Sequence, residues 1–436
     1  MIVAGIIAAT LAGWAAIGVR RDLTPVAWIP AWFVAGAALM TGVALVLTPF
    51  GVSLPVASAI AALLSLGAAS LRLRNMTRSP DEGRAARAHL IDLLPLTAVS
   101  AFVWKAAVVP LWSWDHFAIW GVKARWFAAT GSLMPGFLSD PGFGSSLPSY
   151  PIGYPSLMAV LSFGEEIGAR DVKILHIVFG LALVVMVRES IRAMTGNVEI
   201  AAVAAALVAI SPLFWDTESL GLAEVPMMAT TLTAIVLCIA PGQGRLNCIV
   251  AGALLGWVAW IKTEGFVLSA CVLLALVFGG SIRPSDRVRF SASWMAVALA
   301  AVGVGWTLPS GTSFFSGDYL ARAGARLPEF HAILAPIAGE LLRVEWFGMW
   351  VVSLVIIVRR VSLGRRVGTA LAAAVAVQFT LYVAVYFFTY LDPAKHIDSS
   401  FFRIAAALLP LAIIAAGALL NGGRARGAAS APDVAD

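Results

Sequence analysis

The chain has 436 residues, of which 60% are hydrophobic and only 12% are charged. Its mean hydropathy is +0.89, and no stretch is both polar enough and long enough to form a separate soluble domain. The formal charge of +6 does not indicate nucleic-acid binding, because the cations are divided between two sets of loops. The composition predicts an all-α protein that crosses a membrane many times.

Apolar runs recur along the whole chain, and each run of roughly 17–22 residues can cross about 30 Å of hydrocarbon as a helix. The first run lacks a basic region and a cleavage site, so we interpret it as a span and not as a signal peptide. Several runs are short enough to be tilted or re-entrant. We expect about thirteen spans, near residues 1–19, 27–48, 53–71, 90–111, 173–188, 199–214, 224–241, 247–261, 265–280, 290–308, 346–358, 367–390 and 404–421.

Charge divides the loops between these spans into two kinds. Arginine clusters in alternate loops, including the one that ends the first three spans, and the positive-inside rule makes these loops cytoplasmic. The N-terminus is then outside and the C-terminus inside. All five lysines and most acids fall at the opposite ends of the spans, so we expect the chemistry on the outer face. We divide the chain into residues 1–89 (three spans and a basic loop), 90–421 (a helical core) and 422–436 (a disordered tail).

The most informative outer segment runs from Trp112 to Trp126 and directly follows an apolar span. Four tryptophans surround an acid, an imidazole and two cations there, and tryptophan is typical of the membrane interface. Residues 115–130 have their apolar side chains at helical spacing, which predicts an amphipathic helix lying in the interface. Residues 329–345, in a second long outer loop, could form another.

Asp115 is the candidate general base of this segment, because activating a hydroxyl or amine requires a carboxylate within hydrogen-bond reach. The alternatives are a helix N-cap or an ion pair with Lys123 or Arg125. We interpret His116 as a structural or acceptor-binding neighbour of Asp115 in preference to a catalytic residue. Lys123 and, further along the chain, Glu264 are candidate pocket-lining residues.

Two tyrosines lie later in the same outer loop, in the stretch 149–155, where proline and glycine fix an irregular backbone. Tyr150 and Tyr154 could stack on a sugar or line a pocket. A structural turn held by the prolines explains them equally well.

Three further outer positions carry charge. Glu224 opens a span, where it either orders an acceptor or merely complements the helix dipole. Lys262 lies between two spans and could hold a phosphate, or it could simply neutralise Glu264 or extend to the interface. Arg403, near the start of the last span, suits a departing phosphate or serves as an interfacial anchor.

No residue spacing in the sequence predicts a metal site or another cofactor. The three cysteines, Cys238, Cys248 and Cys271, lie in or beside apolar spans and are expected to be small core residues.

The order of these motifs resembles the GT-C superfamily of polyprenyl-phosphate-dependent glycosyltransferases, in particular bacterial proteins similar to protein mannosyltransferases and aminoarabinose transferases. The motifs are an Asp after a span, a Trp- and Lys-rich segment, Tyr-Pro-x-x-Tyr-Pro, Gly-x-Ala-Glu-Val-Pro, Lys-Thr-Glu-Gly, and a late Arg before a span containing Leu-Pro. The resemblance covers about residues 90–421 and implies a helix bundle in a bacterial inner membrane, with interfacial helices in the first large outer loop.

The resemblance also implies roles for individual residues. Asp115 matches the catalytic carboxylate of the family, Glu224 a second acid, Lys262 a donor-phosphate ligand, and Arg403 the arginine before the final span. The expected function is therefore an inverting transfer from a polyprenyl-phosphate sugar to a glycan, lipid or protein acceptor. A secondary transporter or lipid flippase, and a structural subunit, are the alternatives.

Overall fold

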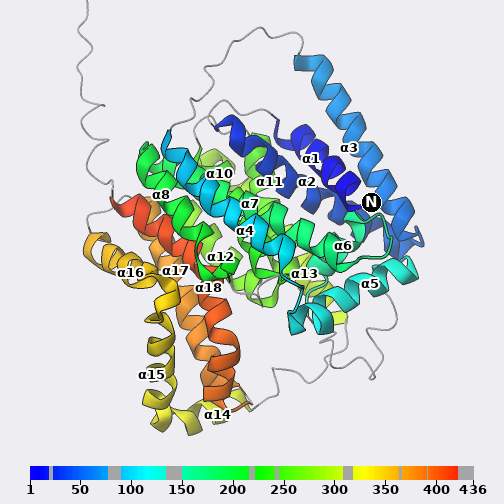
Figure 1. The fold of residues 1–436 in the computed structure, drawn as a ribbon. Helices are drawn as coiled ribbons and strands as arrows, with labels where there is room; N and C mark the ends of the chain where they lie inside the picture. Colours follow the sequence, from blue (N-terminus) through cyan, green and yellow to red (C-terminus); the bar gives the residue numbers. More distant parts are fainter. Residues whose placement is uncertain are drawn as a thin grey trace, which may run out of the picture.

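The computed structural model describes residues 1–18, 23–76, 90–133, 150–215, 221–240, 245–307, 318–362, 366–389 and 391–420. These residues form helices joined by short turns and contain no strand, so the expected all-α class is confirmed (Figure 1). Within them, six helices are long and apolar enough to cross a membrane. They are α2 (Pro25–Leu47), α3 (Leu54–Met76), α7 (Ala169–Thr195), α13 (Pro284–Thr307), α17 (Arg366–Phe388) and α18 (Pro393–Leu420).

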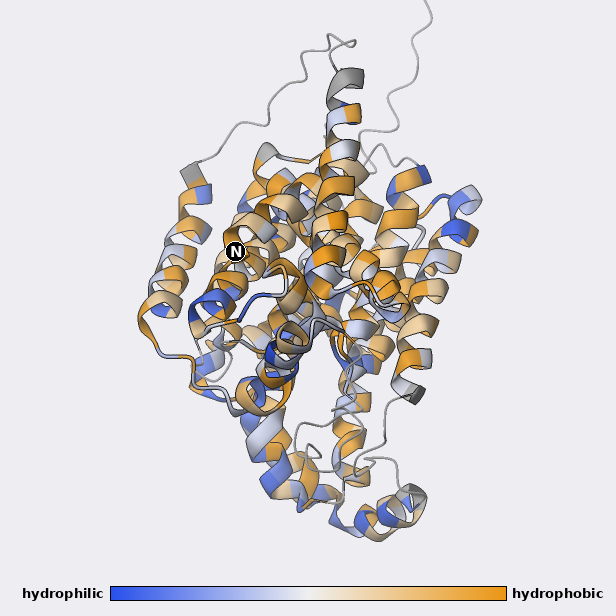
Figure 2. Ribbon diagram, turned by 90° about the vertical axis from the view of Figure 1, so that its right-hand side faces the viewer, coloured by the Kyte–Doolittle hydropathy of each residue, from blue (hydrophilic) through white to orange (hydrophobic). Residues whose placement is uncertain are grey.

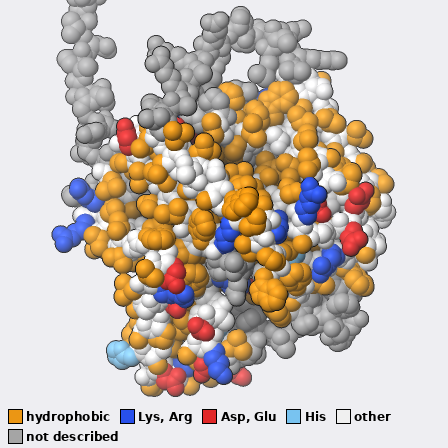
Figure 3. Space-filling model, in the orientation of Figure 1, with side chains coloured by type: hydrophobic (Ala, Val, Ile, Leu, Met, Phe, Trp, Pro, Cys, Tyr) orange, Lys and Arg blue, Asp and Glu red, His pale blue; other side chains and the backbone are white. Residues whose placement is uncertain are grey.

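The other helices are shorter. The apolar ones are α1 (Ile2–Ile17), α4 (Leu93–Val108), α8 (Val198–Ala209), α10 (Glu224–Ile239), α11 (Arg245–Ile261) and α12 (Thr263–Phe278). The remainder are α5 (Gly121–Thr130), α6 (Gly153–Leu161), α9 (Pro212–Trp215), α14 (Tyr319–Arg326), α15 (Phe330–Leu341) and α16 (Met349–Arg360). Hydrophobic residues follow the bundle helices over their whole length, whereas hydrophilic residues gather in the lobe at the lower end (Figure 2). The surface between the charged clusters is largely apolar (Figure 3), as expected for a lipid-facing wall.

Helix α10 is the centre of the bundle. Every residue from Glu224 to Cys238 is buried, and the helix packs between α7 and α11. A helix that is apolar on all sides can be surrounded by protein or by lipid, and α10 is surrounded by protein. Its first residue, Glu224, is consequently a carboxylate held inside the protein.

Helices α1 and α2 pack closely through glycine. A Cβ atom at Gly36 would lie 1.7 Å from the carbonyl oxygen of Ala9, and one at Gly13 would lie 1.8 Å from that of Trp32. Small residues allow two helix backbones to approach in this way. Helix α2 also packs against α7, so the N-terminal helices adjoin the rest of the bundle directly.

Each of the thirteen expected spans contains a helix, but several boundaries were wrong. Helix α7 covers 169–195 where 173–188 was expected, α13 begins at Pro284 where 290 was expected, and α18 begins at Pro393 where 404 was expected. Pro393 takes the first helical position, and Asp392 caps the helix by accepting a hydrogen bond from the Lys395 N–H at 3.0 Å. Arg403 therefore lies inside α18 and not before it.

The two expected outer-loop helices are present as helical segments. Residues His116–Trp120 form a π-helical turn that continues into α5, and α15 is followed by the 3-10 turn Val344–Trp346. Helices α14 and α15, with the adjacent ends of α17 and α18, form the lobe at the bottom of Figure 1. Other expectations lie outside the described residues: the basic loop beyond residue 76, the outer-loop residues 134–149, and the tail 422–436.

Candidate functional site

Asp115 and Arg403 form an ion pair. Asp115 directly precedes the π-helical turn, and Arg403 extends from α18 to place Nη1 2.6 Å from the Asp115 Oδ2 atom. The two side chains are 28% and 22% exposed, respectively. The Asp115 side chain makes no capping hydrogen bond to this turn, so the N-cap alternative is wrong. Asp115 does form an ion pair, but its partner is Arg403 and not Lys123 or Arg125. The candidate base and a candidate phosphate ligand therefore meet.

Glu224, Lys262 and Glu264 form a second charged group. Lys262 lies between α11 and α12 and has an extended backbone. The first turn of α12 lies close to the end of α11, because Gly265 packs directly against the carbonyl of Val258. This geometry places Lys262 Nζ 2.8 Å from Glu224 Oε1 and 3.0 Å from Glu264 Oε1. Burial alone would lower the pKa of Lys262, but the two carboxylates outweigh it and hold this pKa well above its usual value.

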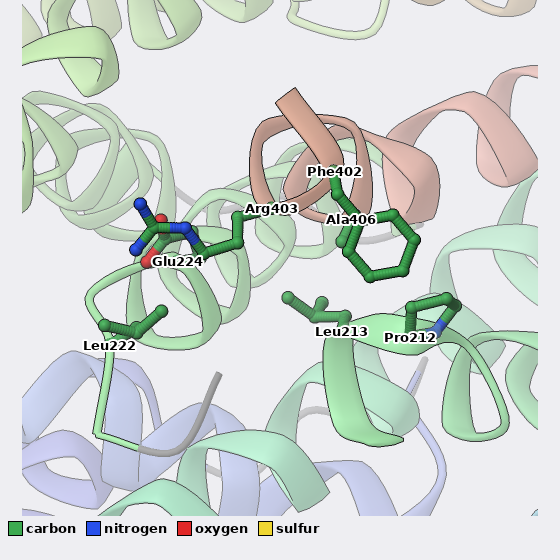
Figure 4. Close-up of a pocket in the computed structure, with 7 residues that line it drawn as sticks. All are labelled: Pro212, Leu213, Leu222, Glu224, Phe402, Arg403 and Ala406. Atoms are coloured by element: carbon green, nitrogen blue, oxygen red, sulfur yellow. The ribbon is translucent and has the colours of Figure 1, made fainter. Parts of the chain in front are cut away.

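The two charged groups adjoin each other. Arg403 and Glu224 line one small cavity of about 10 Å³, room for about one water molecule. Figure 4 shows the Arg403 guanidinium extending toward the Glu224 carboxylate, with Phe402 turned to the other side. Glu224 Oε2 is buried without a hydrogen-bond partner among the described residues. Together the groups contain three carboxylates and two cations, which leaves a net charge of −1.

Tyr150 and Tyr154 pack against Trp120 beside this cluster. The Tyr150 ring stacks on Trp120 at a centroid distance of 5.8 Å, and Tyr154 meets it edge-on at 6.2 Å. Tyr154 lies in α6 and is fully buried, and its hydroxyl has no hydrogen-bond partner among the described residues. Burial, reinforced by nearby carboxylates, raises the pKa of both tyrosines. One face of Tyr150 is thus occupied by tryptophan.

Lys123 lies on the buried face of α5. Its side chain is fully buried, and Nζ donates a hydrogen bond to the Tyr150 carbonyl at 3.1 Å. Burial lowers the pKa of this amine to about 7. Lys123 therefore connects α5 to the tyrosine segment.

Two histidines flank a left-handed glycine next to Asp115. His116 Nδ1 lies 3.4 Å from the Gly221 carbonyl oxygen, and the Gly221 N–H donates to His176 Nδ1 at 3.4 Å. Gly221 has φ of +80°, a conformation that favours glycine. Burial lowers the pKa of His116 to about 4, and the positive charge of Arg125 lowers this pKa further. The hydrogen bond with the Gly221 carbonyl raises the pKa, but by less than burial lowers it. His176 was not among the residues predicted for the site.

Tyr382 and Gln378 of α17 were also missed. Both side chains are buried, and Tyr382 lies close enough to Lys262 and Glu264 to interact electrostatically with them. One turn further, the Tyr386 hydroxyl bonds to Ser400 of α18 at 2.9 Å. The signal was available: residues 378, 382 and 386 are polar at a spacing of four within an apolar span, which places them on one helix face.

The described residues contain no group of three or more histidine, cysteine or acidic side chains placed to hold a metal ion. The cysteines, which were expected in the core, are free thiols that are buried or half-buried. The polar cluster therefore consists of ion pairs and aromatic hydroxyls. No family model, curated protein or solved structure matches the chain.

Proposed function

We propose that the chain is an integral membrane glycosyltransferase. It transfers a sugar from a polyprenyl-phosphate donor to an acceptor at the extracytoplasmic face of a bacterial inner membrane. The observation that carries the proposal is the convergence of Asp115, Glu224, Lys262 and Arg403, which come from four separate parts of the chain. In this proposal the bundle has the GT-C arrangement, with thirteen crossings, the N-terminus outside and the C-terminus in the cytoplasm.

The proposed reaction is a single displacement. Asp115 accepts the proton of an acceptor hydroxyl or amine while that atom attacks the anomeric carbon of the lipid-linked sugar. The bond between this carbon and the phosphate oxygen breaks, and its electron pair leaves with the polyprenyl phosphate. The anomeric configuration inverts, and the leaving group needs no acid because a phosphate ester is already a weak base.

Lys262 and Arg403 are the proposed ligands of the phosphate, where negative charge increases in the transition state. The net charge of the cluster is −1, so an incoming phosphate competes with three carboxylates for two cations. Arg403 is the cation that we expect to shift, because its side chain is 22% exposed while that of Lys262 is 13% exposed and paired twice. Movement of Arg403 would also release the Asp115 carboxylate to act as the base.

The test is transfer of radiolabelled sugar from polyprenyl-phosphate donors to membrane acceptors in right-side-out and inverted vesicles. Asp115→Asn should abolish transfer while the protein still inserts and folds. Asp398→Asn is the matched control, because this exposed acid of α18 takes part in none of the ion pairs described above. Wild-type rates in Asp115→Asn would remove Asp115 from the mechanism. Absence of transfer from every donor, with accumulation of an unmodified substrate in vesicles, would favour transport.

A further inference from the structure

A second, larger cavity opens on the other side of Phe402. This cleft has a volume of about 600 Å³, within the size range of small-molecule sites. Its walls come from α9, from the turn between α15 and α16, and from α18. The lining residues that matter below are Pro212, Trp215, Arg343, Glu345, Phe347 and Phe402.

The turn between α15 and α16 presents an aromatic ring to this cleft. Trp346 is fully buried and anchors the turn through a hydrogen bond from its Nε1 to the Glu340 carbonyl at 2.6 Å. The next residue, Phe347, has φ of +48° and a side chain that is 67% exposed. A bulky residue is strained in the left-handed region, and such strain is concentrated at functional sites.

The rim of the cleft has a fixed charge pattern. Arg343 donates to Glu340 Oε2 at 3.1 Å and to Glu345 Oε1 at 3.0 Å, and its guanidinium lies 4.6 Å from the Phe402 ring centroid. Of these charged residues, Arg343 and Glu345 line the cleft, and their charges balance. Arg343 is already paired with both Glu340 and Glu345, so the lining offers no unpaired cation to a phosphate or an anionic lipid headgroup. A neutral ligand with hydroxyl groups needs no such cation, and the Glu345 carboxylate supplies acceptors for its hydroxyl protons.

Aromatic side chains define the shape of the ligand. Three aromatic residues line the cleft: Trp215, which is 41% exposed, Phe347 and Phe402. A pyranose ring has apolar C–H faces, which suit aromatic rings, and a hydroxyl edge, which suits the rim. The cleft offers both aromatic rings for the C–H faces and charged side chains for the hydroxyl groups of such a ring.

The cleft adjoins the ion-pair cluster. Phe402 and Pro212 line both the cleft and the small cavity that contains Glu224 and Arg403. Since Phe402 and Arg403 are successive residues of α18, one side chain faces the cleft and the next reaches Asp115. We propose that the cleft between α9 and the α15–α16 turn binds the pyranose ring of a neutral glycan, the acceptor of the transfer reaction. The role as acceptor rests on the proposed function, whereas binding of the glycan does not.

Direct binding tests the proposal without any donor. The protein, purified in a zwitterionic detergent that contains no sugar, is titrated calorimetrically with mannotriose, chitotriose and maltotriose. We expect at least one trisaccharide to bind, and Phe347→Gly to raise its Kd at least about tenfold. Glycine accepts the left-handed backbone, so this variant removes the ring and relieves strain. Phe347→Asn is a second ringless variant with the same tolerance. Phe278→Ala, at a similarly exposed phenylalanine at the end of α12, should not change Kd.

Each outcome decides a separate question. Failure of all three sugars to bind, or equal Kd values for wild type and both Phe347 variants, would overturn the inference. Glycan binding that depends on Phe347, without transfer from any donor, would overturn the proposed function and leave the cleft assignment intact. Transfer to a lipid or protein acceptor at an unchanged KM in the Phe347 variants would retain the glycosyltransferase and overturn the glycan cleft.

Discussion

Asp115 and Arg403 are 288 positions apart in the sequence, yet Oδ2 of one lies 2.6 Å from Nη1 of the other. Both side chains remain partly exposed, so water screens much of their attraction. We infer that the pair contributes more to positioning two functional groups than to the stability of the bundle.

Double-mutant analysis measures this coupling. Asp115→Asn and Arg403→Gln should each lower the free energy of unfolding by about 1 kcal/mol or less, as partly exposed pairs do. The double variant should be hardly less stable than either single variant, because each change already removes the same contact. Thermal unfolding in detergent gives the three values. Strictly additive losses would show that the two side chains act independently.

Lys262 and Glu224 should respond unequally to mutation. Lys262→Met leaves the buried Glu224 carboxylate without its hydrogen-bonded cation, and breaking a buried pair in this way costs about 3–5 kcal/mol. Glu224→Gln should cost clearly less, because Lys262 keeps Glu264 at 3.0 Å. The free energies of unfolding of the two variants, measured side by side, test the order. A larger loss for Glu224→Gln would mean that Glu264 does not support the lysine.

Glycine substitutions on α2 provide a test of the helix packing. Gly36→Ala should destabilise the protein by about 2 kcal/mol or more, since the new methyl group would lie 1.7 Å from the Ala9 carbonyl oxygen and force α1 and α2 apart. Gly42→Ala is the matched control on the same helix, with nothing within 4 Å of the new atom. There we expect a gain of about 0.5–1 kcal/mol from the helix preference of alanine. Equal effects at both positions would contradict the close approach.

Local sequence patterns predicted the presence of the helices, because each long apolar run forms a helix. The start of α18 was missed although Asp392 and Pro393 form a cap and a first helical position, since the charged residues after them obscured the helix. The Gln378, Tyr382 and Tyr386 stripe was equally visible at a spacing of four, but it lay within a segment interpreted only as apolar.

The partners of the site residues could not be predicted from the sequence in the same way. Lys123 and Arg125 were the neighbours of Asp115 in sequence, whereas its partner comes from α18, which only the packing of the bundle brings near. Lys123 was expected to line a pocket, and its burial depends on which face of α5 turns inward. Tertiary contacts of this kind have no local signature in one sequence.

His116 should make stability depend on pH. Its pKa is lowered to about 4 in the folded protein, mainly by burial, against about 6.5 in the unfolded chain. The unfolded state therefore binds a proton first as pH falls. The folded protein has its full stability above pH 6.5 and loses about 3 kcal/mol between pH 6.5 and 4 from this group. His116→Asn removes the titrating group while it retains a donor for the Gly221 carbonyl. We expect the difference in unfolding free energy between wild type and this variant to change by that amount over the interval. A pH-independent difference would mean that His116 remains hydrated in the folded protein.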